Sequence, residues 1–517
     1  MSEAAEAHYR RGIELQDAGK LVEACDSYRA AISRDARHAR AHNNLGVLLQ
    51  ARRDFAGAIA SYELALGADP ALVHAIRNLA AAWLEQQDAV RAESIVKDAL
   101  VRYPRDAELH FIHGNALRAM GRPAQAASAY QSAVALDERL PGLDLNLGLA
   151  LAEDDAHKGE AYFQGLRERQ PNSAAPLIYL GGFYGNAGKY DLAAGCYRRA
   201  MALEPDMAQA HFNYAVTILL TGDYEKGLDE YEWRWRLPEL AGLFPGYAEP
   251  AWTGGSLEGK SILLFSEQGL GDVIQFARYI PMVGKSATRV LVRCPESLKS
   301  LLQRSFPGVT VCSDVDPLPR FDVHCALMSL PRIFGTRPDR IPNAVPYLHA
   351  DPAAASRWGS ELGSGRLKVG LCWGTESRSG PQKSMHLRAL EPLGRVQGVS
   401  FYSLQRGSFA REAAEPPPGL DITVFAGLRD FSDDAALAMN LDLIISVDTA
   451  VAHLAGALAK PVWMLTPNPP DWRWRLQGED SPWYPTMRLF RQTRPGEWQS
   501  VIASVSSALA QLAKLTR

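Results

Sequence analysis

The sequence has few features of a secreted or membrane protein. Its six cysteines, at positions 25, 196, 294, 312, 325 and 372, form no CxxC pair and have no histidine at zinc spacing. This excludes a disulfide scaffold and fits a reducing compartment. No apolar run is long enough to span a bilayer, and Met1 to Arg11 is too polar for a secretory signal. We therefore expect a cytoplasmic protein without an integral membrane segment.

The chain also lacks an excess of charge. Its formal net charge is -3, with 22% charged residues. Proteins that hold nucleic acid by neutralising phosphates need a basic surface, so nucleic acid is not an expected partner. No carboxylate cluster has metal-ligand spacing, and we expect neither a metal nor a cofactor. At 517 residues the chain is too long for one core and predicts two or three domains.

The N-terminal 240 residues repeat with a period of 34 positions. Helix pairs of this length cannot bury their apolar faces alone, so neighbouring units stack into an α solenoid with a concave groove. The pattern resembles the tetratricopeptide repeat. Seven units are expected, and the fifth is irregular because Glu160 and Gln164 occupy the places of its small and its aromatic residue. Residues that share a phase are Ala24, Ala58, Ala92 and Ala126; Tyr28, Tyr62 and Tyr130; and Gly12, Gly46 and Gly114.

Asparagine recurs at the sixth position of the units, which is expected to face the groove. An Asn side chain offers an acceptor and two donor hydrogens, so a row of them can bind the backbone of an extended peptide. The alternative is that Asn is merely common at this position, and both interpretations stay open. The four residues are Asn44, Asn78, Asn146 and Asn213, with Asn115 one turn further along its helix.

The helical period stops around Trp233 to Trp252, and short apolar runs then alternate with helical patterns. This alternation predicts parallel sheets flanked by helices, in two Rossmann-like lobes with a cleft between them. The expected domains are residues 1–240, 252–350 and 366–517. Expected strands are Ser261 to Phe265, Arg289 to Arg293, Lys368 to Trp373, Ser400 to Leu404, Asp421 to Phe425, Leu443 to Val447 and Val462 to Leu465.

Three segments at expected strand ends contain candidate site residues. After the first strand, Gly269 and Gly271 predict a tight turn, and Asp272 is either a helix N-cap or a carboxylate that accepts a proton. The third glycine of the dinucleotide fingerprint is missing, which argues against a nucleotide-sugar epimerase. In SVDTAVAHLAGAL, a helix begins directly after Asp448 and Thr449 and can bind a phosphate. His453 can add a hydrogen bond or a positive charge there. The third segment offers the phosphate donors Thr375, Ser377, Arg378, Ser379 and Lys383.

These segments resemble the GT-B glycosyltransferases of the heptosyltransferase type, and especially bacterial proteins that fuse such a domain to tetratricopeptide repeats. The resemblance implies that Asp272 is the general base. It also implies that a nucleotide-sugar substrate is bound by Thr375, Lys383, Thr449, Ala450 and His453. Heptosyltransferases usually carry Gly where this chain has Ala450. Asp448 is expected to orient the loop or to pair with Lys383.

Two further loops are candidates for the donor site. Gln405, in the loop Gln405 to Gly407, either contacts the nucleoside or lies in a surface turn. The rings of Trp472 and Trp474 either stack on a sugar or base, or are buried against the sheet.

The resemblance implies an inverting transfer of sugar to a hydroxyl group. A groove for extended chain next to a transferase favours a protein acceptor, as in O-linked sugar transferases and flagellin-modifying enzymes of this architecture. Two alternatives remain open at this point: transfer to lipopolysaccharide or another glycan, and a non-catalytic protein-binding scaffold.

Overall fold

The computed structural model describes residues 3–241, 244–363, 366–376 and 381–515. It consists of two compact units, Met1–Phe183 and Tyr184–Arg517, each described here by itself.

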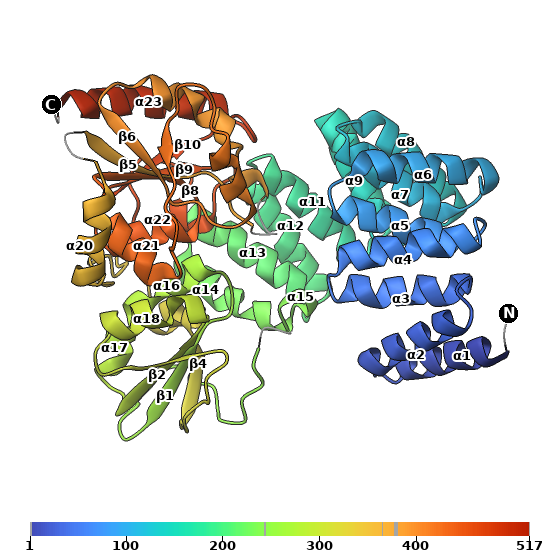
Figure 1. Cartoon of the computed structure of the whole chain (residues 1–517), viewed down its shortest axis with the longest axis horizontal. Coiled ribbons are helices and arrows are strands. Elements are labelled where there is room, and N and C mark those ends of the chain that lie inside the picture. The colour runs from blue at the N-terminus through green and yellow to red at the C-terminus, as the bar shows by residue number, and fades with distance from the viewer. Residues whose placement is uncertain (1–2, 242–243, 364–365, 377–380, 516–517) are drawn as a thin grey trace. The chain divides into compact units, whose positions relative to one another are not determined.

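The first unit consists of antiparallel helix pairs that stack on one another (Figure 1). Helix starts follow the predicted period, and Asp54, Asp88 and Asp106 cap three of them by accepting a backbone N–H. The helices are α1 (Glu3–Asp17), α2 (Leu21–Arg34), α3 (Ala39–Ala51), α4 (Phe55–Ala68), α5 (Val73–Glu85), α6 (Ala89–Arg102), α7 (Ala107–Ala119), α8 (Pro123–Leu136), α9 (Leu143–Asp154), α10 (Ala156–Arg169) and the start of α11 (Ala175–Asn186).

In the first, second and fourth repeats, a tyrosine ring packs onto a glycine of the preceding helix. A Cβ at Gly46 would lie 2.5 Å from Cε1 of Tyr62, so no side chain fits beneath this ring. The third repeat has Ala80 at the glycine phase and the smaller Val96 at the tyrosine phase. In the fifth unit, the ring of Phe163 lies on Gly148, and Gly159 packs against Ala152. The prediction that Glu160 and Gln164 occupy the small and aromatic places was therefore wrong. A one-residue deletion between α9 and α10 moves the small and the aromatic residue of this unit one position earlier in the sequence. The packing of helix on helix is the same as in the regular units.

The second unit begins with four helices and a short 3-10 helix, followed by a four-stranded parallel sheet in the order β3-β2-β1-β4. The opening elements are α12 (Tyr190–Leu203), α13 (Ala208–Thr221), α14 (Tyr224–Glu230), η1 (Tyr231–Arg236) and α15 (Pro238–Ala241). The first lobe contains β1 (Ser261–Phe265), α16 (Leu270–Phe276), η2 (Ala277–Tyr279), α17 (Ile280–Gly284), β2 (Arg289–Cys294), α18 (Glu296–Ser305), β3 (Thr310–Ser313), β4 (Val323–Ala326), η3 (Leu327–Ser329) and α19 (Leu330–Ile333).

The second lobe contains a six-stranded parallel sheet in the order β10-β9-β8-β5-β6-β7. Its elements are α20 (Pro352–Glu361), β5 (Leu367–Cys372), η4 (Pro381–Lys383), η5 (Leu387–Arg395), β6 (Val399–Ser403), η6 (Ser408–Ala414), β7 (Ile422–Thr423), α21 (Phe431–Ala438), β8 (Leu443–Val447), α22 (Ala450–Ala457), β9 (Val462–Thr466), η7 (Trp472–Trp474), β10 (Met487–Arg491) and α23 (Trp498–Leu515).

The two faces of this sheet are covered by different helices. Leu443, Ile445 and Val447 of β8 pack in a cluster with α23, whereas Ile444 packs in the cluster that contains α21 and α22. Successive side chains of a strand point to opposite faces, so an unbroken apolar strand fits between two helical layers. Figure 1 shows α23 on one side of the sheet and α22 on the other.

The last repeat shares its core with the lobes. Leu219, Tyr224 and Leu228 belong to the same buried cluster as Ile262 of β1 and Leu454 of α22. The compact units therefore divide at Phe183 and Tyr184, ahead of the end of the repeats near residue 240.

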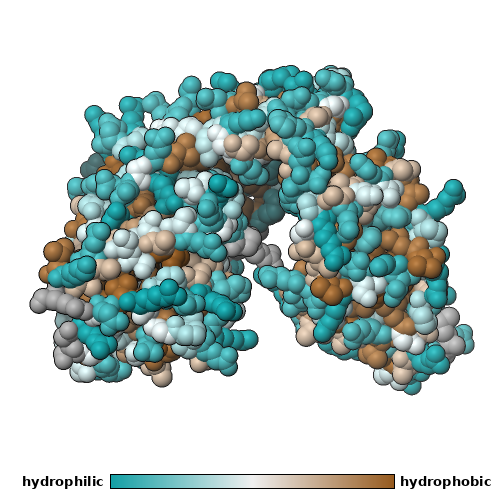
Figure 2. Space-filling view, turned by 90° about the horizontal axis from the view of Figure 1, so that it is seen from above, coloured by the Kyte–Doolittle hydropathy of each residue, from teal (hydrophilic) through white to brown (hydrophobic). Residues whose placement is uncertain are grey.

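Exposed large apolar side chains are scattered over the surface and are mostly not next to one another in the sequence. Figure 2 shows a face on which hydrophilic residues predominate and apolar ones form small patches. Such scattered residues are normal for a folded chain. Among the described residues, no helix combines the length and apolar character needed to cross a membrane.

Candidate active site

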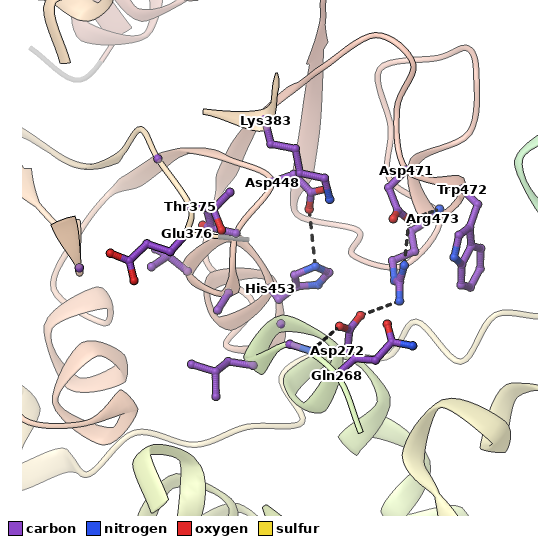
Figure 3. A pocket seen from close by; sticks show the side chains of 18 of the residues that line it. Gln268, Asp272, Thr375, Glu376, Lys383, Asp448, His453, Asp471, Trp472 and Arg473 are labelled. Atoms are coloured by element: carbon purple, nitrogen blue, oxygen red, sulfur yellow. Dashed lines mark hydrogen bonds and ion pairs between the residues drawn. The ribbon is translucent and has the colours of Figure 1, made fainter. Parts of the chain in front are cut away.

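A cavity of about 1020 Å³ lies within the second unit, at the carboxyl ends of β1, β5 and β8 (Figure 3). In both sheets, strand order reverses at this edge, between β1 and β4 and between β5 and β8. Ligands of open parallel sheets bind at such switch points. The predicted residues that line the cavity are Gly269, Gly271, Asp272, Thr375, Lys383, Gln405, Asp448, Thr449, Ala450 and His453.

Asp272 lies in the first turn of α16, and Gly269 is the N-cap of that helix. The prediction that Asp272 is the N-cap of this helix was therefore wrong. The Gly269 N–H donates to Oδ2 of Asp272 at 3.0 Å, and Nη2 of Arg473 donates to Oδ1 at 2.6 Å. Burial raises the pKa of Asp272 above its ordinary value, although Arg473 opposes this shift. The carboxylate is thus oriented at both oxygens beside the cavity.

Arg473 connects the loop after β9 to the first lobe. Its Nε donates to Oε1 of Gln275 at 2.7 Å, and its Nη1 pairs with Oδ1 of Asp471 at 2.9 Å. Burial would raise the pKa of Asp471, but Arg473 and Lys383 together lower it to about 2. Arg473 was not among the predicted site residues, because only the rings of this segment were candidates. The signal in the sequence was an arginine between two tryptophans and two positions after an aspartate.

The two tryptophans of this loop are buried. Trp474 is fully buried with its ring centroid 5.3 Å from that of His453, and Trp472 packs edge-on to Trp483. Burial against the sheet, the second of the two predicted alternatives, is therefore observed for Trp474. Trp472 is 3% exposed and borders the cavity.

Lys383 and Asp448 form an ion pair, with Nζ 2.7 Å from Oδ2. The expected pairing of these residues is confirmed. Asp448 Oδ1 lies 3.8 Å from Nε2 of His453, whose Nδ1 is hydrogen-bonded to the Tyr484 hydroxyl at 2.9 Å. Burial lowers the pKa of His453 to about 3, so the ring is neutral near pH 7. Burial therefore disfavours the positive charge that was one of the two predicted contributions of His453.

The remaining predicted residues are bonded within the protein. Gln405 accepts from the N–H groups of Trp373 and Gly374, both at 2.9 Å, and donates to the Gly374 carbonyl at 3.0 Å. Its amide thus fixes the loop after β5. The Thr449 hydroxyl lies 2.9 Å from that of Ser446, and the backbone of Thr375 bonds the Ser384 hydroxyl. Ser377, Arg378 and Ser379 lie outside the described residues.

Gly271 allows the two lobes to approach closely. A Cβ on this residue would lie 2.8 Å from Cδ2 of His453 and 3.5 Å from Cα of Ala450. Gly269 has φ of -68°, which any residue can adopt. The close contact with α22 thus explains why position 271 is a glycine. The predicted tight turn does not require a left-handed backbone conformation at Gly269.

We expect Gly271→Ala to lower the free energy of unfolding of the second unit by about 1–3 kcal/mol, the usual cost of overpacking. The buried His453 ring has Trp474 and Tyr484 beside it and cannot move away freely. Urea titration followed by circular dichroism measures the change. In the control Gly195→Ala, on α12, the new methyl group meets nothing within 4 Å. Equal stability of the two variants would contradict the close-approach explanation.

Comparison with known proteins identifies the repeats. The family model described as tetratricopeptide repeat matches residues 9–73, 111–174 and 184–235. Protein FlbA of Caulobacter vibrioides is 31% identical over 346 residues, which are 60% of this chain and 56% of FlbA. The match thus spans little more than half the length of that relative.

Similar solved structures include a tetratricopeptide repeat protein from Parabacteroides merdae, with a TM-score of 0.40 at 16% identity, covering 45% of this chain and 92% of the other. Another is YrrB, described as having an unusual peptide-binding site, with a TM-score of 0.29 at 21% identity, covering 36% and 96%. By its match to the family model, the N-terminal part of this chain, about fourteen helices from α1 to α14, is a solenoid of tetratricopeptide repeats.

Proposed function

We propose that the chain is an inverting glycosyltransferase that moves a sugar from a nucleotide-activated donor to a hydroxyl group of a protein. One observation carries the proposal. Asp272 of the first lobe lines the same cavity as Lys383 and the start of α22 in the second lobe. A base and a phosphate site on facing lobes are the arrangement of the GT-B enzymes that the sequence resembles.

In this mechanism, Asp272 takes the proton of the acceptor hydroxyl while its oxygen attacks the anomeric carbon. The new C–O bond forms as the bond from the anomeric carbon to the phosphate oxygen breaks, which inverts the configuration. Lys383 and the free N–H groups in the first turn of α22 stabilise the departing phosphate. Ala450 and His453 line the cavity beside that phosphate. Arg473 orients Asp272 through its hydrogen bond to Oδ1.

Tetratricopeptide repeats imply a protein partner, and we propose that this partner is the acceptor, with a flagellin as the first candidate. In the first unit, Asn78 donates to Asn43 at 3.0 Å, and Asn43 donates to Asn44 at 3.2 Å. Asn146 accepts from Arg118 at 3.3 Å, and Asn213, in the second unit, accepts from Gln209 at 2.8 Å. All four predicted asparagines are partly exposed and retain capacity for a peptide backbone.

The experiment is a transfer assay with a panel of nucleoside mono- and diphosphate sugars. Replacing Asn44, Asn78, Asn146 and Asn213 together with Ala is expected to reduce transfer to protein at least tenfold, about 1.4 kcal/mol of binding. Donor hydrolysis should stay unchanged because these residues lie outside the cavity. Mass spectrometry of the acceptor and release of nucleotide measure the two rates. Transfer at the native rate would remove the asparagines from acceptor binding.

A non-catalytic scaffold is the second candidate, and the charge of the cavity favours it. Among the lining residues that the structure describes, the cations Lys383, Arg406 and Arg473 are outnumbered by carboxylates, so these residues offer an anionic donor no excess of positive charge. The carboxylates are those of Glu239, Asp272, Glu376, Asp448 and Asp471. If no nucleotide sugar raises the melting temperature and none is hydrolysed, the transferase proposal fails and the scaffold remains.

A further inference from the structure

The last repeat supplies an apolar wall to the cavity. Phe212 and Val216 are four residues apart on α13, so they lie on the same helix face. Leu240 of α15 lines the cavity with them, and all three side chains are partly exposed. Gln209 lines the cavity from the same helix, and its amide nitrogen already donates to Asn213 at 2.8 Å. A phosphate or a sugar hydroxyl placed on the three apolar side chains themselves would lose water without gaining a hydrogen-bond partner.

This wall is connected to the proposed base through a short series of contacts. The ring of Phe212 lies 5.3 Å from that of Tyr231, and the Tyr231 ring lies 6.4 Å from that of Trp472. Trp472 precedes Arg473, which bonds Asp272 at 2.6 Å. In addition, Gln268 of the α16 loop donates to the Tyr231 hydroxyl at 3.4 Å. The wall and Asp272 therefore lie close enough for one ligand to contact both. A ligand group that binds the wall would lie near the hydroxyl that Asp272 deprotonates.

The charges near the wall restrict what can occupy it. The exposed Glu239 of α15 borders the cavity next to Leu240, and the carboxylates of Asp272 and Asp471 in the same cavity share the single cation Arg473. Carboxylates of a ligand would be repelled here and apolar groups would not. The occupant that fits is a chain segment with apolar and no acidic side chains.

We infer that α13 is an acceptor-recognition element, which binds the apolar residues that flank the accepting Ser or Thr in an extended segment of the protein substrate. The inference rests on the proposed function and specifies its acceptor. The seventh repeat then belongs to the transferase site itself, in addition to any peptide binding by earlier repeats.

The test uses the full chain and two fluorescein-labelled serine peptides, one with valines and one with aspartates on both sides of the serine. Fluorescence anisotropy is expected to show at least tenfold tighter binding of the valine peptide. Phe212→Ala should weaken that binding about tenfold, a loss of roughly 1.4 kcal/mol. The matched control is Leu203→Ala, which removes an apolar side chain of α12 that is 43% exposed and outside the cavity. Its binding should equal that of the native chain.

Equal binding of both peptides by the native chain would overturn the inference, even if Phe212→Ala failed to fold. An unchanged affinity in a folded Phe212→Ala chain would place peptide binding elsewhere and would also overturn it. Thermal unfolding shows whether the variant is folded. Because peptide binding needs no donor, failure here leaves the donor panel intact as a separate test of the proposed transferase.

Discussion

Asp272→Asn is expected to lower the rate of glycosyl transfer by about 10² to 10⁴ fold, the usual contribution of a general base. The amide keeps the shape of the carboxylate, and its oxygen can still accept from Arg473, but it cannot take a proton. Donor affinity should change little, because the proposed phosphate site is built by Lys383 and α22. Initial rates with saturating donor, together with donor titration, measure the two effects separately.

The pH dependence of the native chain gives a second readout of the same group. Burial raises the pKa of Asp272, and only the ionised form accepts a proton. Activity should therefore fall as pH drops through this raised pKa, at higher pH than for an ordinary Asp, and Asp272→Asn should lose this acidic limb. The control Asp314→Asn, whose carboxylate is 60% exposed in the same lobe, should behave like the native chain. Native turnover in Asp272→Asn would exclude this residue as the base.

Arg234→Met is expected to cost about 3–5 kcal/mol of stability, because it leaves a buried carboxylate without its partner. The Arg234 side chain is fully buried, and that of Glu267 is 2% exposed. Two hydrogen bonds join them, from Nε to Oε2 at 2.7 Å and from Nη2 to Oε1 at 2.8 Å, and Nη2 also bonds Ser329 at 2.8 Å. This pair connects the end of the last repeat to the loop that leads to Asp272.

The loss in Arg234→Met should grow with pH. Burial already raises the pKa of Glu267 in the native chain, and removing the guanidinium raises it further. A carboxyl group with a folded-state pKa above its unfolded value stabilises the fold when protonated, and this contribution is lost as pH rises. Urea unfolding at pH 5 and pH 8 measures the difference.

Two further variants separate the buried pair from a general effect of losing an arginine. Arg234→Met combined with Glu267→Leu should recover much of the stability, because no buried charge remains. Arg236→Met, at a side chain that is 61% exposed, should change stability by less than about 1 kcal/mol, as for other surface ion pairs. If Arg234→Met and Arg236→Met were equally stable, the buried pair would have no special role.

Much of the local structure could be predicted from the sequence. Strands β1 and β8 have the predicted bounds, because an apolar run followed by a polar turn is a local pattern. Strands β3, β4 and β10 were missed. The first two have four residues each, and runs so short have little periodicity. The pattern of apolar residues from Asp272 to Val283 predicts one helix, but the structure divides this segment into α16, η2 and α17, the last with Pro281 in its first turn.

The sequence by itself determined the repeat period, the parallel sheets and the strand ends where candidate polar residues gather, since each of these depends on neighbouring residues. It could not determine which of those residues meet. Arg473 and Asp272 are 201 positions apart, and α13 borders their cavity only because the last repeat shares a core with the lobes. The neutral state of His453 likewise follows from burial, which tertiary packing alone decides.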